Sequence, residues 1–346
     1  MSGQSRIASI DESPGEAAIQ RVVGNTSDAG SETDSEYEGE PKRPPSKGSR
    51  PLSPRELYEL GQSRLYRFLR FGRLNDIQEA IEHGAIAVYL TPKDHPSMPK
   101  RLATLGASYC NRFQRLGELT DIRRAIECIT RSVNLVPSNH PDLPGYLASL
   151  GSSYFTRFQR LNELDDVEKA IEYHTRAVNS TPNGAERLPD YLASLGSSYY
   201  VRFKRLGELD DIQKAIKYVA RALYSTLTDH PDLPDRLDCL GVCYLARFQR
   251  LGELDDIQKS IKYGTDALDL TASNHPRLAH RFASLGMSYY SRFHRLGQLD
   301  DIKKAIECDI RALDLTPSDH PDLLRRLESL GLSYYTRFHI TNLGPT

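Results

Sequence analysis

Glycine recurs every 45 residues along most of this chain, with no insertion or deletion between the copies. The positions are Gly61, Gly106, Gly151, Gly196, Gly241, Gly286 and Gly331. Each is followed six and seven positions later by Arg-Phe. A fixed period of this length is typical of one supersecondary unit stacked on copies of itself. The sequence therefore predicts a repeat protein, whose function depends on the surface that the stack presents.

Apolar residues within each copy have the spacing of two amphipathic helices. In the third copy, those from Leu147 to Leu161 are three or four apart, which predicts one helix over about 143–161. We call it helix A. A second stripe, from Val167 to Val178, predicts helix B, which ends before Pro182.

Turn residues mark the helix ends. Left-handed residues that end helix A are expected at Gly72, Gly117, Asn162, Gly207, Gly252 and Gly297. The expected N-caps of helix B are Asn75, Thr120, Asp165, Asp210, Asp255 and Asp300, with capping boxes such as Asp165 with Glu168. The next helix A is expected to start at Asp142, Asp232 or Asp322 in its copy.

A glycine inside every helix A needs a reason, because glycine costs about 1 kcal/mol relative to alanine in a helix. Close approach of helix B would supply it, through small residues. These are Ala80, Ala125, Ala170, Ala215, Ser260 and Ala305.

The residues of the third copy resemble a known repeat. Leu147, Leu150-Gly151 and Tyr154, followed by Ala170, Ala177 and Pro182, are similar to the tetratricopeptide (TPR) pattern. The period is longer than the 34 residues typical of that family. Such long repeats resemble the TPR arrays of fungal proteins that often precede a CHAT domain, a caspase-like protease. The resemblance implies an all-α, right-handed α-solenoid of seven TPR-like helical hairpins, the last one incomplete.

The chain is expected to divide into three parts. Residues 1–50 are rich in Ser, Gly, Glu and Pro, which predicts a disordered tail. The array fills residues 51–340, and 341–346 form a short C-terminal tail. Within the first tail, Ser31, Thr33 and Ser35 each precede an acidic residue by three positions, a context that acid-directed kinases favour. The alternative is a solvated leader with no such role.

Composition excludes several classes of partner. Lys and Arg number 45 against 46 Asp and Glu, so the strong basic excess of nucleic-acid-binding proteins is missing. No apolar run approaches the roughly 18 residues of a membrane span. Five cysteines are an odd number at unequal spacing, which argues against a disulfide framework. We expect a cytoplasmic protein, with the nucleus as the alternative.

No motif indicates catalysis, a cofactor or a metal. Histidines precede proline at His95, His140, His230, His275 and His320. Equivalent positions in stacked copies lie about 20 Å apart, too far for two ligands of one zinc ion, so we read them as loop residues. Cys239 and Cys243 share a helix face and could form a redox pair, but serines replace them in other copies, which favours small packing residues.

A ladder of arginines is the strongest polar pattern. It comprises Arg67, Arg112, Arg157, Arg202, Arg247, Arg292 and Arg337. Because every copy has one, we expect structural pairing with Asp121, Asp166, Asp211, Asp256 and Asp301. A track for phosphate or carboxylate groups is the alternative.

Variation between the copies points to a binding surface. In TPR proteins helix A lines the concave groove, and the resemblance places four varying positions there. The expected partner-binding residues are Phe155, Gln159, Tyr200, Lys204, Leu245, Gln249, Tyr290 and His294. Aromatic rings beside amides and cations suit an extended peptide. The alternative for part of the aromatic line is a place in the core.

The sequence thus favours a non-catalytic scaffold or sensor that binds a protein or peptide. One alternative is the regulatory repeat region of a CHAT-type protease whose catalytic domain is missing from this chain. Another is a self-assembling array. Helix A of the seventh copy carries an apolar stripe that no helix B follows, so we also expect weak self-association through this end.

Overall fold

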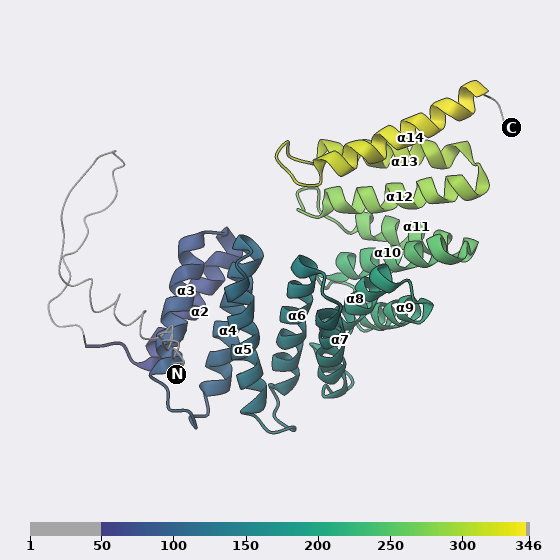
Figure 1. Cartoon of the computed structure of the whole chain (residues 1–346). Helices are drawn as coiled ribbons and strands as arrows, with labels where there is room; N and C mark the ends of the chain where they lie inside the picture. Colours follow the sequence, from purple (N-terminus) through teal and green to yellow (C-terminus); the bar gives the residue numbers. More distant parts are fainter. Residues whose placement is uncertain (1–49, 344–346) are drawn as a thin grey trace, which may run out of the picture. The chain divides into compact units, whose positions relative to one another are not determined.

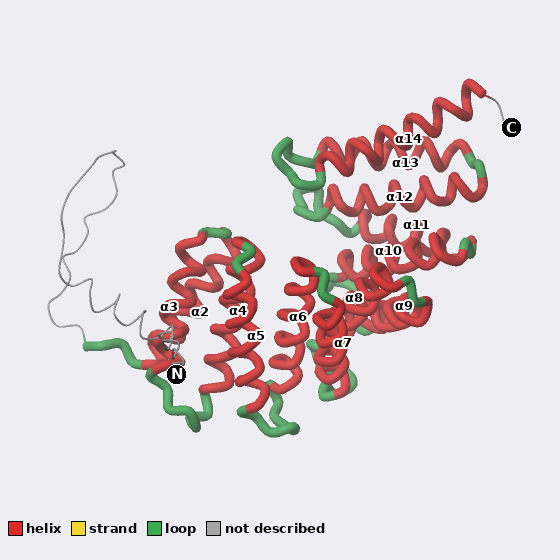
Figure 2. Tube along the Cα trace, viewed as in Figure 1, coloured by secondary structure: helices red, strands yellow, loops and turns green. Residues whose placement is uncertain are grey.

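A computed structural model describes residues 50–343, and these form helices joined by loops, with no strand (Figure 2). The A helices are α2 (Pro54–Phe71), α4 (Met98–Leu116), α6 (Leu143–Leu161), α8 (Leu188–Leu206), α10 (Leu233–Leu251), α12 (Leu278–Leu296) and α14 (Leu323–Leu343). The B helices are α3 (Leu74–Tyr89), α5 (Leu119–Asn134), α7 (Leu164–Asn179), α9 (Leu209–Tyr224), α11 (Leu254–Asp269) and α13 (Leu299–Asp314). The expected phosphorylation segment around Ser31 lies outside the described residues.

The chain divides into two compact units, unit 1 up to Arg160 and unit 2 from Leu161. Within each unit, a helix A packs against the helix B that follows it, and helix B packs against the next helix A (Figure 1). Neighbouring A helices also touch, as α8 and α10 do in unit 2. The all-α array of helical hairpins predicted from the sequence is confirmed.

The predicted ends of helix A are confirmed. The glycines after α2, α4, α8, α10 and α12 have φ between 67° and 76°, and Asn162 has φ 56°. Each of these glycines donates its backbone N–H to the phenylalanine carbonyl four residues earlier, as Gly207 does to Phe203 at 2.7 Å. The left-handed conformation satisfies a carbonyl that the helix end would leave without a partner.

The predicted N-caps of helix B are wrong by two residues. The N-cap of α7 is Glu163, and no side chain caps it, so the expected Asp165 and Glu168 capping box does not form. Asp165 and its equivalents Asn75, Thr120, Asp210, Asp255 and Asp300 lie in the first helical turn instead. Acidic side chains there interact favourably with the helix dipole, which explains why the pattern resembles a cap.

The recurring histidines order the loops before helix A. Nδ1 of His230 accepts the backbone N–H of Asp232 at 3.1 Å. The same bond forms at His95, His140, His275 and His320. Asp232 does occupy the N-cap of α10, but its side chain makes no capping bond. The histidine therefore organises this turn.

The predicted close contact at the mid-helix glycines is confirmed within each unit. A Cβ added to Gly106 would lie 3.0 Å from the Ala125 carbonyl oxygen, and one added to Gly196 would lie 3.2 Å from that of Ala215. The same contact recurs at Gly61, Gly241 and Gly286, with Ala80, Ser260 and Ala305. Gly331 differs, because nothing lies within 4 Å of its added Cβ.

The arginine ladder forms structural ion pairs, as predicted. Arg202 donates from Nε and Nη2 to the buried Asp211 carboxylate at 2.9 and 2.6 Å. Arg112, Arg247 and Arg292 make the same bidentate pairs with Asp121, Asp256 and Asp301. Each of these arginines also lies over a helix A tyrosine. Because the aspartates occupy these guanidinium groups, the alternative of an anion track loses support here.

The apolar stripe of α14 is mostly exposed, although Leu330 packs against Phe293, Ile302 and Ile306. Leu327, Tyr334 and Phe338 are 45, 40 and 62% exposed. Self-association through this helix stays a prediction.

Candidate functional site

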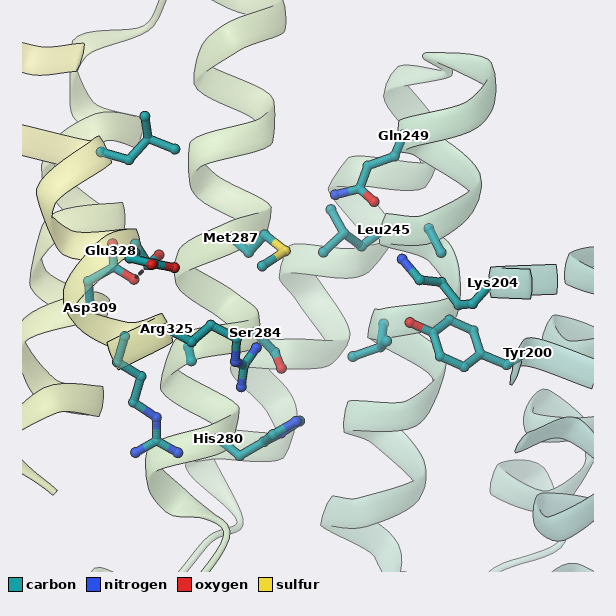
Figure 3. Close-up of a pocket in the computed structure, with 16 residues that line it drawn as sticks. Tyr200, Lys204, Leu245, Gln249, His280, Ser284, Met287, Asp309, Arg325 and Glu328 are labelled. Carbon is teal, nitrogen blue, oxygen red and sulfur yellow. Dashed lines mark hydrogen bonds between the residues drawn. The ribbon is translucent and has the colours of Figure 1, made fainter. Parts of the chain in front are cut away.

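The A helices of unit 2 enclose a groove of about 460 Å³, which we call the A-helix groove. Its walls come from α8, α10, α12, α13 and α14. Figure 3 shows Tyr200 and Lys204 at one side and Asp309 at the other, with Met287 and Arg325 between them. A groove of this size suits a short peptide stretch or a few side chains.

Half of the residues predicted to bind a partner line the groove: Tyr200, Lys204, Leu245 and Gln249. Lys204 and Gln249 are exposed, whereas Tyr200 is half-buried. Burial raises the pKa of Tyr200 to about 12, so its hydroxyl stays neutral and can donate a hydrogen bond. Leu245 is only 5% exposed and packs with Ile257 in the core, so the core alternative holds for this residue.

The other predicted residues lie elsewhere. The rings of Tyr290 and His294 contact each other edge to face at 4.5 Å, and neither lines the A-helix groove. Gln159 lies in unit 1, where it lines a more open hollow beside Arg160. Phe155 is half-buried in unit 1. Binding through these residues stays a prediction.

The groove contains residues that the sequence reasoning missed, among them His280, Ser284, Arg325 and Arg326. The sequence does point to this part of the groove, at the position six residues before each repeat glycine. The residues there are Arg55, Lys100, Gly145, Asp190, Asp235, His280 and Arg325. This position varies in charge from copy to copy, as strongly as the positions that were chosen.

Two buried arginines pair with aspartates at this varying position. Arg236 of α10 is 5% exposed in its side chain, and its Nη2 lies 2.5 Å from Asp190 Oδ1 of α8. Arg281 of α12 makes the same pair with Asp235 of α10. We call these pairs the Arg–Asp rungs, because each joins one helix A to the next.

The third arginine of this series lacks its aspartate. Arg326 of α14 is in register with Arg236 and Arg281, but His280 stands where the aspartate would be. Its side chain is 6% exposed, and Nη1 donates to the Ala312 carbonyl and to the Thr316 hydroxyl. Nε has no partner within the described residues, as is also true of Arg281 in a complete rung. The difference lies at Nη2, whose nearest carboxylate oxygen, on Asp322, is 3.8 Å away. Burial lowers the pKa of Arg326. A buried guanidinium without a close carboxylate is a costly arrangement.

Arg101 in unit 1 also faces no aspartate, since Arg55 stands there. Its guanidinium lies 6.0 Å from the centre of the Tyr58 ring, which compensates part of its charge. Arg326 has no such ring among its described contacts and borders the open groove.

Two acidic residues line the groove, the exposed Glu328 and the buried Asp309. Ser333 and Ser329 of α14 donate their hydroxyls to the buried Asp309 carboxylate at 2.8 and 3.1 Å. Burial raises the pKa of Asp309, and the two hydroxyls lower it in part. Within residues 50–343, no group of three or more His, Cys, Asp or Glu is arranged to hold a metal ion.

Comparisons with known proteins give a fold likeness at low identity. No family model and no curated protein matches this chain. Among solved structures, a kinesin-light-chain-type protein of Podosopora anserina with nearly identical TPR-like repeats is 15% identical, covers 63% of this chain and 97% of its own, and gives a TM-score of 0.46. BtubC from P. vanneervenii is 17% identical, with 76% and 95% covered and a TM-score of 0.47. YrrB, a TPR protein with an unusual peptide-binding site, is 17% identical, with 64% and 92% covered and a TM-score of 0.39.

These scores are too low to support a statement about function, so the architecture is judged on the hairpins themselves. Among the described helices, none is both long and apolar enough to cross a membrane. Three features recur in register along the described chain: a helix A with a central glycine, a helix B with a small residue that faces it, and a left-handed turn between the two helices. The described part of the chain is therefore an all-α array of helical hairpins.

Proposed function

We propose that the A-helix groove of unit 2 binds an extended peptide segment that carries a carboxylate, and that the protein acts as a non-catalytic scaffold or sensor. The observation that carries this proposal is the incomplete Arg–Asp rung at Arg326, which borders the groove. A ligand carboxylate that reached Arg326 would supply the missing half of the rung.

The remaining wall suits a peptide. Tyr200 and Met287 offer apolar contact area, and Met287 is 41% exposed. Gln249 and Ser284 offer groups that can hydrogen-bond to a peptide backbone. Rings and flexible apolar side chains next to amides and hydroxyls are common where proteins bind peptides.

Three basic residues, Lys204, Arg325 and Arg326, and two acidic ones, Asp309 and Glu328, line the groove, and this excess of basic groups favours a carboxylate over a cation. Arg325 is exposed at 56% of its side chain, and Lys204 lines the same groove. Nδ1 of His280 lies 3.6 Å from Oδ2 of Asp238. Asp309 is the buried acid of the wall, and two serine hydroxyls already bind it.

Selection from a random phage-displayed peptide library, with the full chain as bait, would test the proposal. We expect enrichment of peptides that contain Asp or Glu beside an apolar residue. Combining Tyr200→Ala with Lys204→Ala should weaken these peptides at least tenfold, because truncating groove anchors commonly costs about 2 kcal/mol.

Tyr290→Ala with His294→Ala is the matched control, since these residues are in register with Tyr200 and Lys204 but lie outside the groove. This variant should bind the selected peptides as the unaltered chain does. A selection without acidic peptides, or equal losses in the two variants, would refute the groove assignment.

A further inference from the structure

A second groove, of about 430 Å³, lies in unit 1 between α3, α4 and α5. Its apolar wall includes Leu105 and Cys128, with the buried Tyr109 at its base and Tyr89 at its rim. Lys93, Arg124 and Arg131 also line it. We call it the unit 1 groove.

The chain contains the same arrangement in closed form three repeats later, at α9, α10 and α11. There Tyr263 of α11 stacks beside Tyr244 of α10, with ring centres 5.9 Å apart and planes 11° apart. Tyr224 of α9 also interacts with the Tyr263 hydroxyl and helps to raise its pKa. One repeat earlier, Tyr218 stacks beside Tyr199 in the same way, at 5.7 Å.

In the unit 1 groove the stacking ring is missing. Tyr89 and Tyr109 are in register with Tyr224 and Tyr244, but Cys128 stands where Tyr263 would be. Burial raises the pKa of the Cys128 thiol to about 11, so it forms a small neutral wall. The groove therefore retains the partners of a tyrosine ring without the ring.

The charges at the two places also differ. Burial raises the pKa of Tyr263 to about 12, and Asp266 contributes to this rise, so an acid lies within range of that hydroxyl. The residue in register with Asp266 is Arg131, and Lys93 is in register with Thr228. Glu127 lies on the same wall, in register with Lys262, and the guanidinium of Arg124 lies 5.8 Å from the centre of the Tyr109 ring. Three basic residues, Lys93, Arg124 and Arg131, thus line the groove against one acid. An aromatic ring with acidic neighbours fits these charges.

The chain itself carries such a segment. Tyr37 is the only aromatic residue among residues 1–50, and Asp34, Glu36, Glu38 and Glu40 surround it. Twelve residues, 38–49, lie between it and Arg50, where the described part begins. An extended stretch of that length reaches up to about 45 Å, longer than the helices of unit 1, at about 24–28 Å. The segment can therefore reach the groove of its own chain.

We infer that the acidic segment 34–40 docks in the unit 1 groove, with the ring of Tyr37 in the place that Tyr263 occupies three repeats later. Its carboxylates would then lie near Lys93, Arg124 and Arg131. Docking within one chain needs no strong intrinsic affinity, because a short linker gives an effective concentration on the order of millimolar. The unit 1 groove is separate from the A-helix groove of unit 2 and does not depend on the function proposed for it.

A tryptophan reporter would test this inference, because the chain has no tryptophan. In the full chain with Tyr37→Trp, docking predicts blue-shifted emission that acrylamide quenches poorly, at every protein concentration. Cys128→Tyr fills the groove from within and should release the reporter to solvent. Arg131→Asp restores the charge found at Asp266 and should release it as well, without altering the core.

Arg311→Asp is the matched control, since Arg311 is an exposed arginine in register with Arg131 and belongs to unit 2. It should leave the emission unchanged. Solvent-like emission in the reporter chain, or emission that neither Cys128→Tyr nor Arg131→Asp alters, would overturn the inference. A blue shift that vanishes on dilution would assign the groove to a second copy and would overturn docking within one chain.

Discussion

The groove between α3, α4 and α5 and the closed site between α9, α10 and α11 are built from the same positions of the repeat. At the closed site Tyr263 fills the space beside Tyr244, whereas Cys128 leaves it open beside Tyr109. The Arg–Asp rungs show the same contrast, because Arg281 has Asp235 and Arg326 faces His280. Copies in which every position is filled thus show which group the incomplete copies lack. Candidate binding sites are the places where a copy departs from the common pattern of the repeat.

The contrast between interior and uncovered glycines should give the largest effect on stability. A Cβ on Gly196 would lie 2.5 Å from Val219 Cγ2 and 3.2 Å from the Ala215 carbonyl oxygen. Gly196→Leu should therefore lower the free energy of unfolding by about 3 kcal/mol. Gly331→Leu meets nothing within 4 Å and should raise it by about 0.5–1 kcal/mol through helix propensity. Urea denaturation measures both, and equal losses would contradict the helix A to helix B contact.

Opening a complete rung should have the next largest effect. Asp235→His gives Arg281 the surroundings of Arg326 and leaves its 2% exposed side chain without a carboxylate. Because the Asp235 side chain is 31% exposed, we expect a loss of about 2–3 kcal/mol, at the low end for a broken buried pair. Urea denaturation again measures it, and a neutral result would show that these rungs contribute little.

Closing the incomplete rung should give a smaller gain. His280→Asp supplies a carboxylate to Arg326, and Asp238→Ala, which copies Ala193 in register, removes the acid beside position 280. The double variant should gain about 1 kcal/mol, typical of one added hydrogen bond to a charged group. Asp238→Ala alone is the control and should show no gain. A double variant no more stable than that control would argue against a missing carboxylate at Arg326.

The smallest effect concerns the pH dependence of stability. Val219 and Asp309 occupy the same position of the repeat, and burial raises the pKa of Asp309 above its ordinary 3.8. The folded state therefore binds the proton of Asp309 more tightly than the unfolded state does. The stabilisation that results is fully present at a pH below the ordinary pKa, and it is lost as the pH rises through the raised pKa. Asp309→Val should remove this decline from urea titrations across the acidic range. An unchanged decline would assign it to other groups.

Strictly periodic features could be predicted from the sequence. The glycine to small-residue contacts recur in five hairpins, and the bidentate Arg–Asp pairs recur at Arg112, Arg202, Arg247 and Arg292, so several copies supported the same interpretation. The first hairpin departs from it, since Arg67 makes a single contact of 3.4 Å with Asp76. The N-caps were misplaced because an aspartate in the first turn and one at the cap leave the same sequence pattern.

Only half of the residues predicted to bind a partner line the A-helix groove, because the shape of this groove depends on several helices at once. Leu245 and Tyr200 share a position of the repeat, yet Leu245 lies in the core while Tyr200 is half-buried at the groove. Tyr290 is in register with both and packs on His294 instead. The residues of one repeat do not reveal how wide the space between successive A helices is. The replacement of the expected aspartate by His280, in contrast, can be read directly from the sequence.

The most direct test of the account compares the arginines of complete and incomplete rungs in one experiment. In the full chain with ¹⁵N-labelled arginine, the Nε–H resonances of Arg236, Arg281 and Arg326 would be followed by NMR while N-acetylglutamate is added. The account predicts that Arg326 shifts and saturates, that Arg236 and Arg281 stay in place, and that His280→Asp with Asp238→Ala abolishes the shift. Equal responses from the three arginines, or no response from Arg326, would contradict it.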